Sequence, residues 1–145
     1  MTIIYKTTLI QQSLEKMMAL VEDVEHYPEF LPGCEQVVIQ EKTDCMMKVE
    51  VTAGWHGFVK KFTTCNTKPR PHEIHMVLVN GPFEHLQGVW SFESVDGACR
   101  VSMQLDFKFK NFVFQKMFEQ RMNVVVEKVF QAFCNVALNE ATRSS

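Results

Sequence analysis

The chain has 145 residues, of which 46% are hydrophobic and 22% are charged, and its formal net charge is −2. This composition excludes a disordered chain, and no apolar run approaches the ~18 residues that a membrane span requires. The small negative charge excludes a general electrostatic attraction to nucleic acid or to anionic lipid.

The length predicts a single domain over residues 1–145. The start of the chain lacks the basic segment and the apolar segment of a secretory signal. The cysteines are irregularly spaced and form no CxxC pair, which is typical of reduced cytosolic thiols. They are Cys34, Cys45, Cys65, Cys99 and Cys134. We therefore expect a soluble protein of the cytoplasm.

The first thirty or so residues predict one strand and two short helices. Residues 3–9 are rich in β-branched side chains and alternate in type, as a strand does. Ser13 offers an N-cap oxygen to a helix whose apolar stripe runs from Leu14 to Val21. Residues 26–33 carry a proline near the start of a helical turn and a Pro-Gly pair at its end.

From Cys34 to Phe109 the apolar residues recur at every second position, which predicts six further strands. The apolar faces consist of Val37, Ile39, Met47, Val49, Val51, Ala53, Phe58, Phe62, Ile74, Met76, Leu78, Leu86, Gly88, Trp90, Phe92, Val101, Met103, Leu105, Phe107 and Phe109. Turn residues separate the strands, and the pair Asp96-Gly97 is a strong hairpin signal. Consecutive hairpins predict an antiparallel meander.

Residues 111–140 predict one long amphipathic helix, with apolar side chains at three- and four-residue steps. Its apolar stripe consists of Phe114, Phe118, Met122, Val125, Val129, Phe133 and Val136. Such a helix is roughly 40 Å long, so its apolar face needs the breadth of a sheet. The chain therefore predicts an α+β fold of order β-α-α-β-β-β-β-β-β-α. In this fold a curved antiparallel sheet of about seven strands wraps on the C-terminal helix.

The strand alternation also predicts which polar side chains face the interior. Glu50 and Asp106 are out of phase with their apolar neighbours, so both carboxylates face away from the core. Lys60 and Thr64 share the phase of Phe62 and point inward, unless a bulge reverses that phase. Such an interior offers little for acid–base catalysis, and no GxSxG, P-loop or dinucleotide motif is present. We therefore expect no catalytic residues and no enzyme activity.

The histidines predict no metal site. His72 and His75 fall on opposite faces of a predicted strand, and His26, His56 and His85 stand apart from any paired cysteine ligand.

Two surface features leave alternatives open. Lys108, Lys110, Lys116 and Arg121 cluster around the start of the last helix, either as a solvated face or as a contact to phosphate or ribosomal RNA. Trp55, at a predicted hairpin tip, packs on its own loop, touches a membrane or covers the mouth of a pocket.

The interior is predicted to be rich in aromatic side chains and in conformationally adaptable methionines, because the chain contains 12 Phe, 2 Trp and 9 Met. This composition fits an ordinary core or the walls of a cavity. A strongly curved sheet and a straight helix cannot stay in contact along their whole length, which favours a gap between them. The predicted lining is Phe62, Thr64, Met76, Trp90, Phe92, Leu105, Phe107, Phe118, Met122 and Val125, with Tyr27, Phe30 and Leu31 near the mouth.

Four sequence blocks together resemble a known family. They are YPEFLPGC at 27–34, FTT at 62–64, NGPF at 80–83 continuing to Leu86, Gly88, Trp90 and Phe92, and LDF at 105–107. Through these blocks the whole chain resembles the bacterial RatA proteins. These are relatives of the mitochondrial coenzyme Q-binding protein within the START-like, polyketide-cyclase-type (SRPBCC) superfamily.

The resemblance implies a helix-grip fold, of the START-like and Bet v 1-like type, with a cavity for a hydrophobic ligand. Ubiquinone or another polyprenyl lipid is the expected ligand, in support of cellular respiration, and no further cofactor is implied. Thr64 and Lys60 are then candidates for a hydrogen bond to a quinone carbonyl.

The resemblance also implies a ribosome association toxin that binds the large ribosomal subunit and blocks subunit joining, with or without a lipid role. A small polyketide cyclase or aromatase is the third alternative, but the acid and base groups of those enzymes have no clear counterpart among the inward positions. We expect no contact with DNA and at most a peripheral contact with a membrane.

Overall fold

The computed structural model describes residues 2–55 and 57–144, and the side chains of Trp55, Phe58 and 140–144 lie outside the described part. The secondary structure elements in chain order are β1 (Thr2–Ile10), α1 (Leu14–Glu22), the 3₁₀ turn η1 (Val24–His26), α2 (Tyr27–Phe30), β2 (Cys34–Lys42), β3 (Met46–Trp55), β4 (Phe58–Thr67), β5 (Glu73–Asn80), β6 (Phe83–Val95), β7 (Ala98–Phe109), α3 (Phe112–Phe118) and α4 (Arg121–Ser144).

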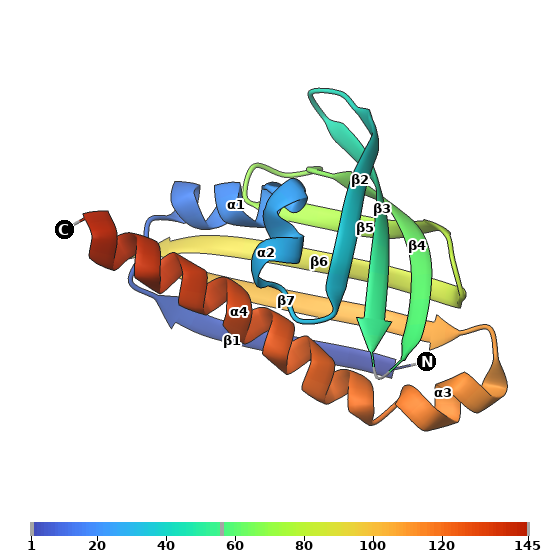
Figure 1. Cartoon of the computed structure of the whole chain (residues 1–145). Coiled ribbons are helices and arrows are strands. Elements are labelled where there is room, and N and C mark those ends of the chain that lie inside the picture. The colour runs from blue at the N-terminus through green and yellow to red at the C-terminus, as the bar shows by residue number, and fades with distance from the viewer. Residues whose placement is uncertain (1, 56, 145) are drawn as a thin grey trace.

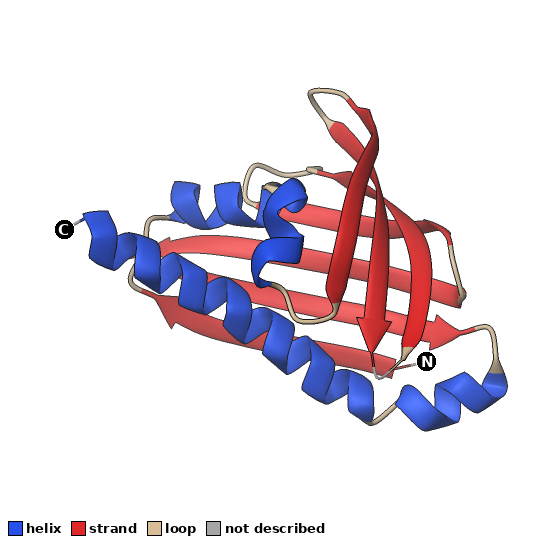
Figure 2. Cartoon of the chain, in the orientation of Figure 1, coloured by secondary structure: helices blue, strands red, loops and turns tan. Residues whose placement is uncertain are grey.

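The seven strands form one antiparallel sheet in the order β1-β7-β6-β5-β4-β3-β2. Strands β2 to β7 follow one another as a meander, and β1 pairs with β7 at the far edge. The sheet is strongly twisted, so β2, β3 and β4 run steeply across the direction of β6, β7 and β1 (Figure 1). All helices lie on the concave side of the sheet or at its ends (Figure 2). The predicted α+β fold with a curved seven-stranded sheet is confirmed.

The hairpin between β6 and β7 has the predicted turn. Asp96 and Gly97 have φ angles of 50° and 84°, and Val95 pairs with Ala98 across the two-residue loop. Both central residues of a type I′ turn need a positive φ, which is why an Asp-Gly pair suits this position. The turn sets the register of the two longest strands.

The predicted short helices are also present. The Ser13 side chain accepts a hydrogen bond from the backbone N–H of Lys16 and caps α1, which buries Leu14, Met17 and Val21. Helix α2 is a single turn with proline in its first turn.

The terminal helix differs from the prediction, because it is two helices rather than one. Asn111 accepts hydrogen bonds from the backbone N–H groups of Val113 and Phe114 and caps α3, and the helix then breaks at residues 119–120 before α4 begins. No glycine or proline stands at this break, so the sequence carried no helix-breaking signal. No helix in the described part has the length and apolarity needed to cross a membrane.

Helix α4 is anchored to the rest of the fold through its C-terminal half. The Phe133 ring meets the rings of Tyr27, Phe30 and Trp90 edge to face, at centroid distances of 5.2, 5.3 and 5.1 Å. The buried Gln12 side chain donates a hydrogen bond to the Ala137 carbonyl oxygen at 3.2 Å. These contacts join α4 to α2, to the sheet and to the segment before α1. This end of the molecule is a filled core.

We predict that Phe133→Ala destabilises the fold by about 4 kcal/mol, because the substitution leaves a cavity among three aromatic rings. The thermal unfolding midpoint should fall by roughly 10 °C. Val124→Ala in the same helix is the matched control, since Val124 is exposed and its truncation should leave the midpoint almost unchanged. Equal midpoints for the two variants would show that Phe133 does not anchor α4.

Candidate functional site

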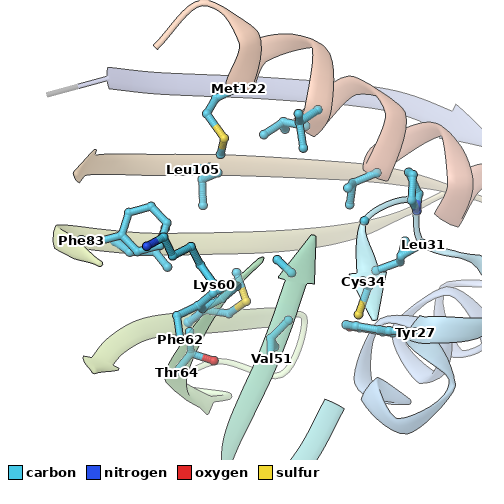
Figure 3. A pocket seen from close by; sticks show the side chains of 18 of the residues that line it. Tyr27, Leu31, Cys34, Val51, Lys60, Phe62, Thr64, Phe83, Leu105 and Met122 are labelled. Atoms are coloured by element: carbon cyan, nitrogen blue, oxygen red, sulfur yellow. The ribbon is translucent and has the colours of Figure 1, made fainter. Parts of the chain in front are cut away.

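A cavity of about 360 Å³ lies between the sheet and the N-terminal half of α4 (Figure 3). Its walls come from the α2 region, from β3 to β7, and from α3 and α4. The volume falls in the range of small-molecule sites, which is about 300–1,000 Å³. The packed rings of Tyr27, Trp90 and Phe133 close the cavity at the end where the filled core begins.

Most of the side chains predicted to contact a ligand line this cavity. They are Tyr27, Leu31, Phe62, Thr64, Met76, Trp90, Leu105, Phe118, Met122 and Val125. The strand residues reach the cavity because they share the inward phase of the sheet. The helix residues reach it because they lie on one stripe. Contact between these side chains and a ligand stays a prediction.

Three predicted residues lie outside the lining. Phe92 is buried and stacks on Trp90, Phe107 is fully buried with its ring edge against Phe109, and Phe30 packs against Phe133. Alternation identifies the face of the sheet on which a side chain lies. It does not identify which neighbouring side chains cover a residue on that face. Phe92 and Phe107 are part of the buried core, and Phe30 is partly buried against it.

Sequence reasoning missed several lining residues, of which Asn66 is the most informative. Asn66 follows Thr64 by two positions on β4 and therefore shares its inward phase, so the alternation could have identified it. The register between β4 and β5 shifts at Thr63 and Thr64, where the additional residue, Val79, is on β5. Strand β4 therefore keeps its phase, and Lys60, Thr64 and Asn66 all face the cavity.

Thr64 and Asn66 form a polar pair in an otherwise apolar wall. The Thr64 side chain is 3% exposed, and its hydroxyl donates a hydrogen bond to Asn66 Oδ1 at 2.9 Å. Both residues line the cavity, and since Asn66 Oδ1 accepts this hydrogen bond, the Asn66 amide N–H groups are the donors that the pair has left. A carbonyl group of a bound molecule could accept a hydrogen bond from the Asn66 amide.

The mouth of the cavity is marked by the lining residues that are exposed, which are Pro32, Lys60 and Arg121. Lys60 Nζ lies 5.2 Å from the centroid of the Phe114 ring, so it bridges β4 and α3. Arg121, predicted as part of a basic cluster, stands at this rim. The rim therefore carries two cations, while the interior is apolar.

The other members of the predicted basic cluster have local partners or lie beside α3. Lys108 forms an ion pair with Glu84 at 3.3 Å, and Lys116 Nζ lies 4.9 Å from the centroid of the Phe112 ring. Lys110 is exposed directly before α3.

No Asp, Glu or His of the described residues lines the cavity. Glu50 accepts a hydrogen bond from Gln40 at 3.4 Å, and neither Glu50 nor Asp106 is part of the lining, as their strand phase predicts. Within residues 2–55 and 57–144, no three His, Cys, Asp or Glu side chains lie together as a metal site requires. The cavity has the character of a binding site for an uncharged, apolar molecule.

The titratable groups at the α2 end of the cavity are held neutral. Burial raises the pKa of the Tyr27 hydroxyl, which donates a hydrogen bond to the Val21 carbonyl oxygen. Burial also raises the pKa of the Cys34 thiol. Neither side chain brings a charge to the wall at neutral pH.

Comparison with protein families shows a match over residues 10–134 to the family described as polyketide cyclase / dehydrase and lipid transport. The chain is 39% identical over 131 residues to the ribosome association toxin RatA of Escherichia coli K12, and the alignment covers 90% of this chain and 83% of that protein. It is 25% identical over 126 residues to a mitochondrial coenzyme Q-binding protein homolog of Xenopus laevis, covering 83% of this chain and 52% of that protein.

Solved structures show the same fold at low sequence identity. A START superfamily protein from Mycobacterium smegmatis superimposes with a TM-score of 0.82 at 19% identity, over 93% of this chain and 96% of that one. The Zhui aromatase/cyclase from Streptomyces sp. R1128 gives a TM-score of 0.76 at 18% identity, over 97% of this chain and 93% of that one.

We predict that the thiols react with iodoacetamide in the order of their exposure. Cys45, which is exposed, should react first. Cys34 should react more slowly, because it lies in the cavity wall and its raised pKa lowers the thiolate fraction at neutral pH. Cys134, whose pKa burial raises to about 11, should react only on unfolding. Mass spectrometry of the alkylated peptides over time measures the order, and labelling of Cys34 as fast as that of Cys45 would contradict the placement of Cys34.

Proposed function

This chain belongs to the polyketide cyclase / dehydrase and lipid transport family, and to the RatA group within it. From that premise we propose that it binds a hydrophobic small molecule without transforming it. The observation that carries the proposal is the cavity of about 360 Å³, whose described lining is mainly apolar apart from the part-buried Thr64–Asn66 pair and a cationic rim. Such a cavity gains free energy by removing apolar ligand surface from water.

The proposed ligand class is ubiquinone or a related polyprenyl lipid. The similarity to a relative named as a coenzyme Q-binding protein supports this class. The Thr64–Asn66 pair supplies a hydrogen-bond donor to one quinone carbonyl, and the apolar walls suit the ring substituents and the first prenyl units. The rest of a long prenyl tail would leave through the mouth. A protein that shields ubiquinone from water in this way would support respiration.

An aromatase or cyclase activity is less well supported. The likeness to the Zhui aromatase/cyclase, at 18% identity, concerns the fold alone. Ring closure and dehydration need a group that moves a proton inside the cavity, and the described lining offers no carboxylate or imidazole for this step. We therefore propose a binding protein rather than an enzyme, acting in the cytoplasm as one domain.

Ribosome association is a second function that we propose for the outer surface. The supporting observation is the 39% identity, over 90% of this chain, to a relative named as a ribosome association toxin. This role uses the surface and the first one uses the interior, so one molecule can have both.

We predict that Val51→Trp weakens the binding of a short-tailed ubiquinone and raises its Kd at least tenfold. Val51 lines the cavity from β3, and an indole in its place fills the space that the ligand needs (Figure 3). Val38→Trp is the matched control, because Val38 is exposed on the neighbouring strand β2 opposite Glu50. Isothermal titration measures both variants, and unchanged binding by Val51→Trp would place the ligand elsewhere or exclude it.

We predict that a triple change of Lys108, Lys110 and Lys116 to Glu weakens co-sedimentation with large ribosomal subunits. The slope of log binding constant against log salt should fall by about one for each phosphate that the variant no longer binds. Changing Lys42, Lys68 and Arg70 to Glu alters the net charge equally on other surfaces and serves as the control. If both triple variants bind as the unchanged protein does, the basic residues around α3 are not the ribosome contact.

A further inference from the structure

Helix α3 is apolar on nearly every side, although it lies at the surface. Phe114 and Phe118 face the cavity, and their rings pack together with centroids 5.9 Å apart. The remaining inward position is Gln115, whose side chain accepts a hydrogen bond from the Phe109 backbone N–H and donates one to Thr2 Oγ1. The protein side of α3 is therefore fully used by contacts with the cavity and the sheet.

The outward side of α3 is apolar as well. Phe112, Val113 and Met117 are 70%, 60% and 42% exposed, and at about 100° per residue they lie on one continuous arc with Lys116 between them. A helix that is apolar all round is normally buried. No part of the described chain covers this arc, so its apolar side chains are available to contact an apolar environment outside the protein.

Basic side chains surround the exposed arc. Lys110 precedes α3, Lys116 lies over the Phe112 ring, and Lys60 and Arg121 stand at the adjacent mouth of the cavity. The acidic residues near them are Glu119, at the break between α3 and α4, and Glu84, which forms an ion pair with Lys108 at 3.3 Å. Although the whole chain has a net charge of −2, this corner of the molecule is positive. Aliphatic and aromatic side chains ringed by lysine and arginine are the signature of a segment that lies in the interface of an anionic membrane.

We propose that α3 docks this protein on the surface of an anionic phospholipid bilayer, with Phe112, Val113 and Met117 entering the headgroup region. The apolar arc itself offers little to RNA, because Val113 and Met117 have no aromatic face on which a base can stack, so an RNA contact here would use the lysines alone. Docking in this orientation brings the cavity mouth, at Lys60 and Arg121, to the membrane surface. A lipid can then pass between bilayer and cavity without crossing water. This transfer step rests on the proposed ligand binding, whereas the docking does not.

The experiment is co-sedimentation with vesicles of phosphatidylglycerol and phosphatidylcholine, compared with vesicles of phosphatidylcholine alone. The unchanged protein should bind the anionic vesicles more tightly, and added salt should weaken that binding. Phe112→Gln with Val113→Gln should weaken it at least about tenfold, and Lys110→Gln or Lys116→Gln about fivefold each. Glutamine preserves helix propensity, and the thermal midpoint of each variant should stay unchanged.

The matched control is Ile3→Thr with Tyr5→Thr on β1. The side chains of Ile3 and Tyr5 are 60% and 58% exposed, much like those of Phe112 and Val113. They lie on the outer face of the sheet, where the basic residues that surround α3 do not surround them. This variant should bind vesicles as the unchanged protein does. Equal loss in the control, or no association with anionic vesicles, overturns the proposal. Lysine variants that lose only RNA binding and keep vesicle binding also overturn it. Vesicle binding without any ubiquinone uptake would refute the proposed function alone.

Discussion

The structure depends on one geometric mismatch, between a straight helix and a sheet that curves away from it. At its C-terminal half α4 meets the core through Phe133, whose ring touches three other aromatic rings. Two to three turns earlier, Val125 and Met122 are only half-buried and face the cavity. Because packed interiors tolerate few voids, a space of about 360 Å³ in an apolar interior indicates a site for a guest molecule.

The chemistry of the walls follows from the same geometry. Period-two alternation keeps strand carboxylates such as those of Glu50 and Asp106 out of the lining, so the interior receives mainly apolar side chains and the hydroxyl and amide of Thr64 and Asn66. That pair can orient a carbonyl group but cannot move protons as an acid–base catalyst would. Among the lining residues that the structure describes, the cations Lys60 and Arg121 lie where the lining reaches solvent. These residues therefore support the proposal of a binding protein.

Much of the fold could be predicted from local patterns, because each pattern has one structural solution. Alternation identified all seven strands, Asp96-Gly97 fixed one hairpin, and Ser13 marked the start of α1. The break at residues 119–120 was missed because no glycine or proline there signals it. Phe92 and Phe107 were assigned to the lining but are buried core residues, because alternation does not predict which neighbouring side chains cover a position.

The most direct test of this account is to identify the small molecules that the protein releases when it is purified without detergent, denatured and extracted into organic solvent. Mass spectrometry of the extract should find a prenylated quinone or a related polyprenyl lipid in proportion to the protein. A protein that releases no lipid, and that takes up no ubiquinone when titrated with it, would contradict the claim that the cavity exists to hold an apolar guest.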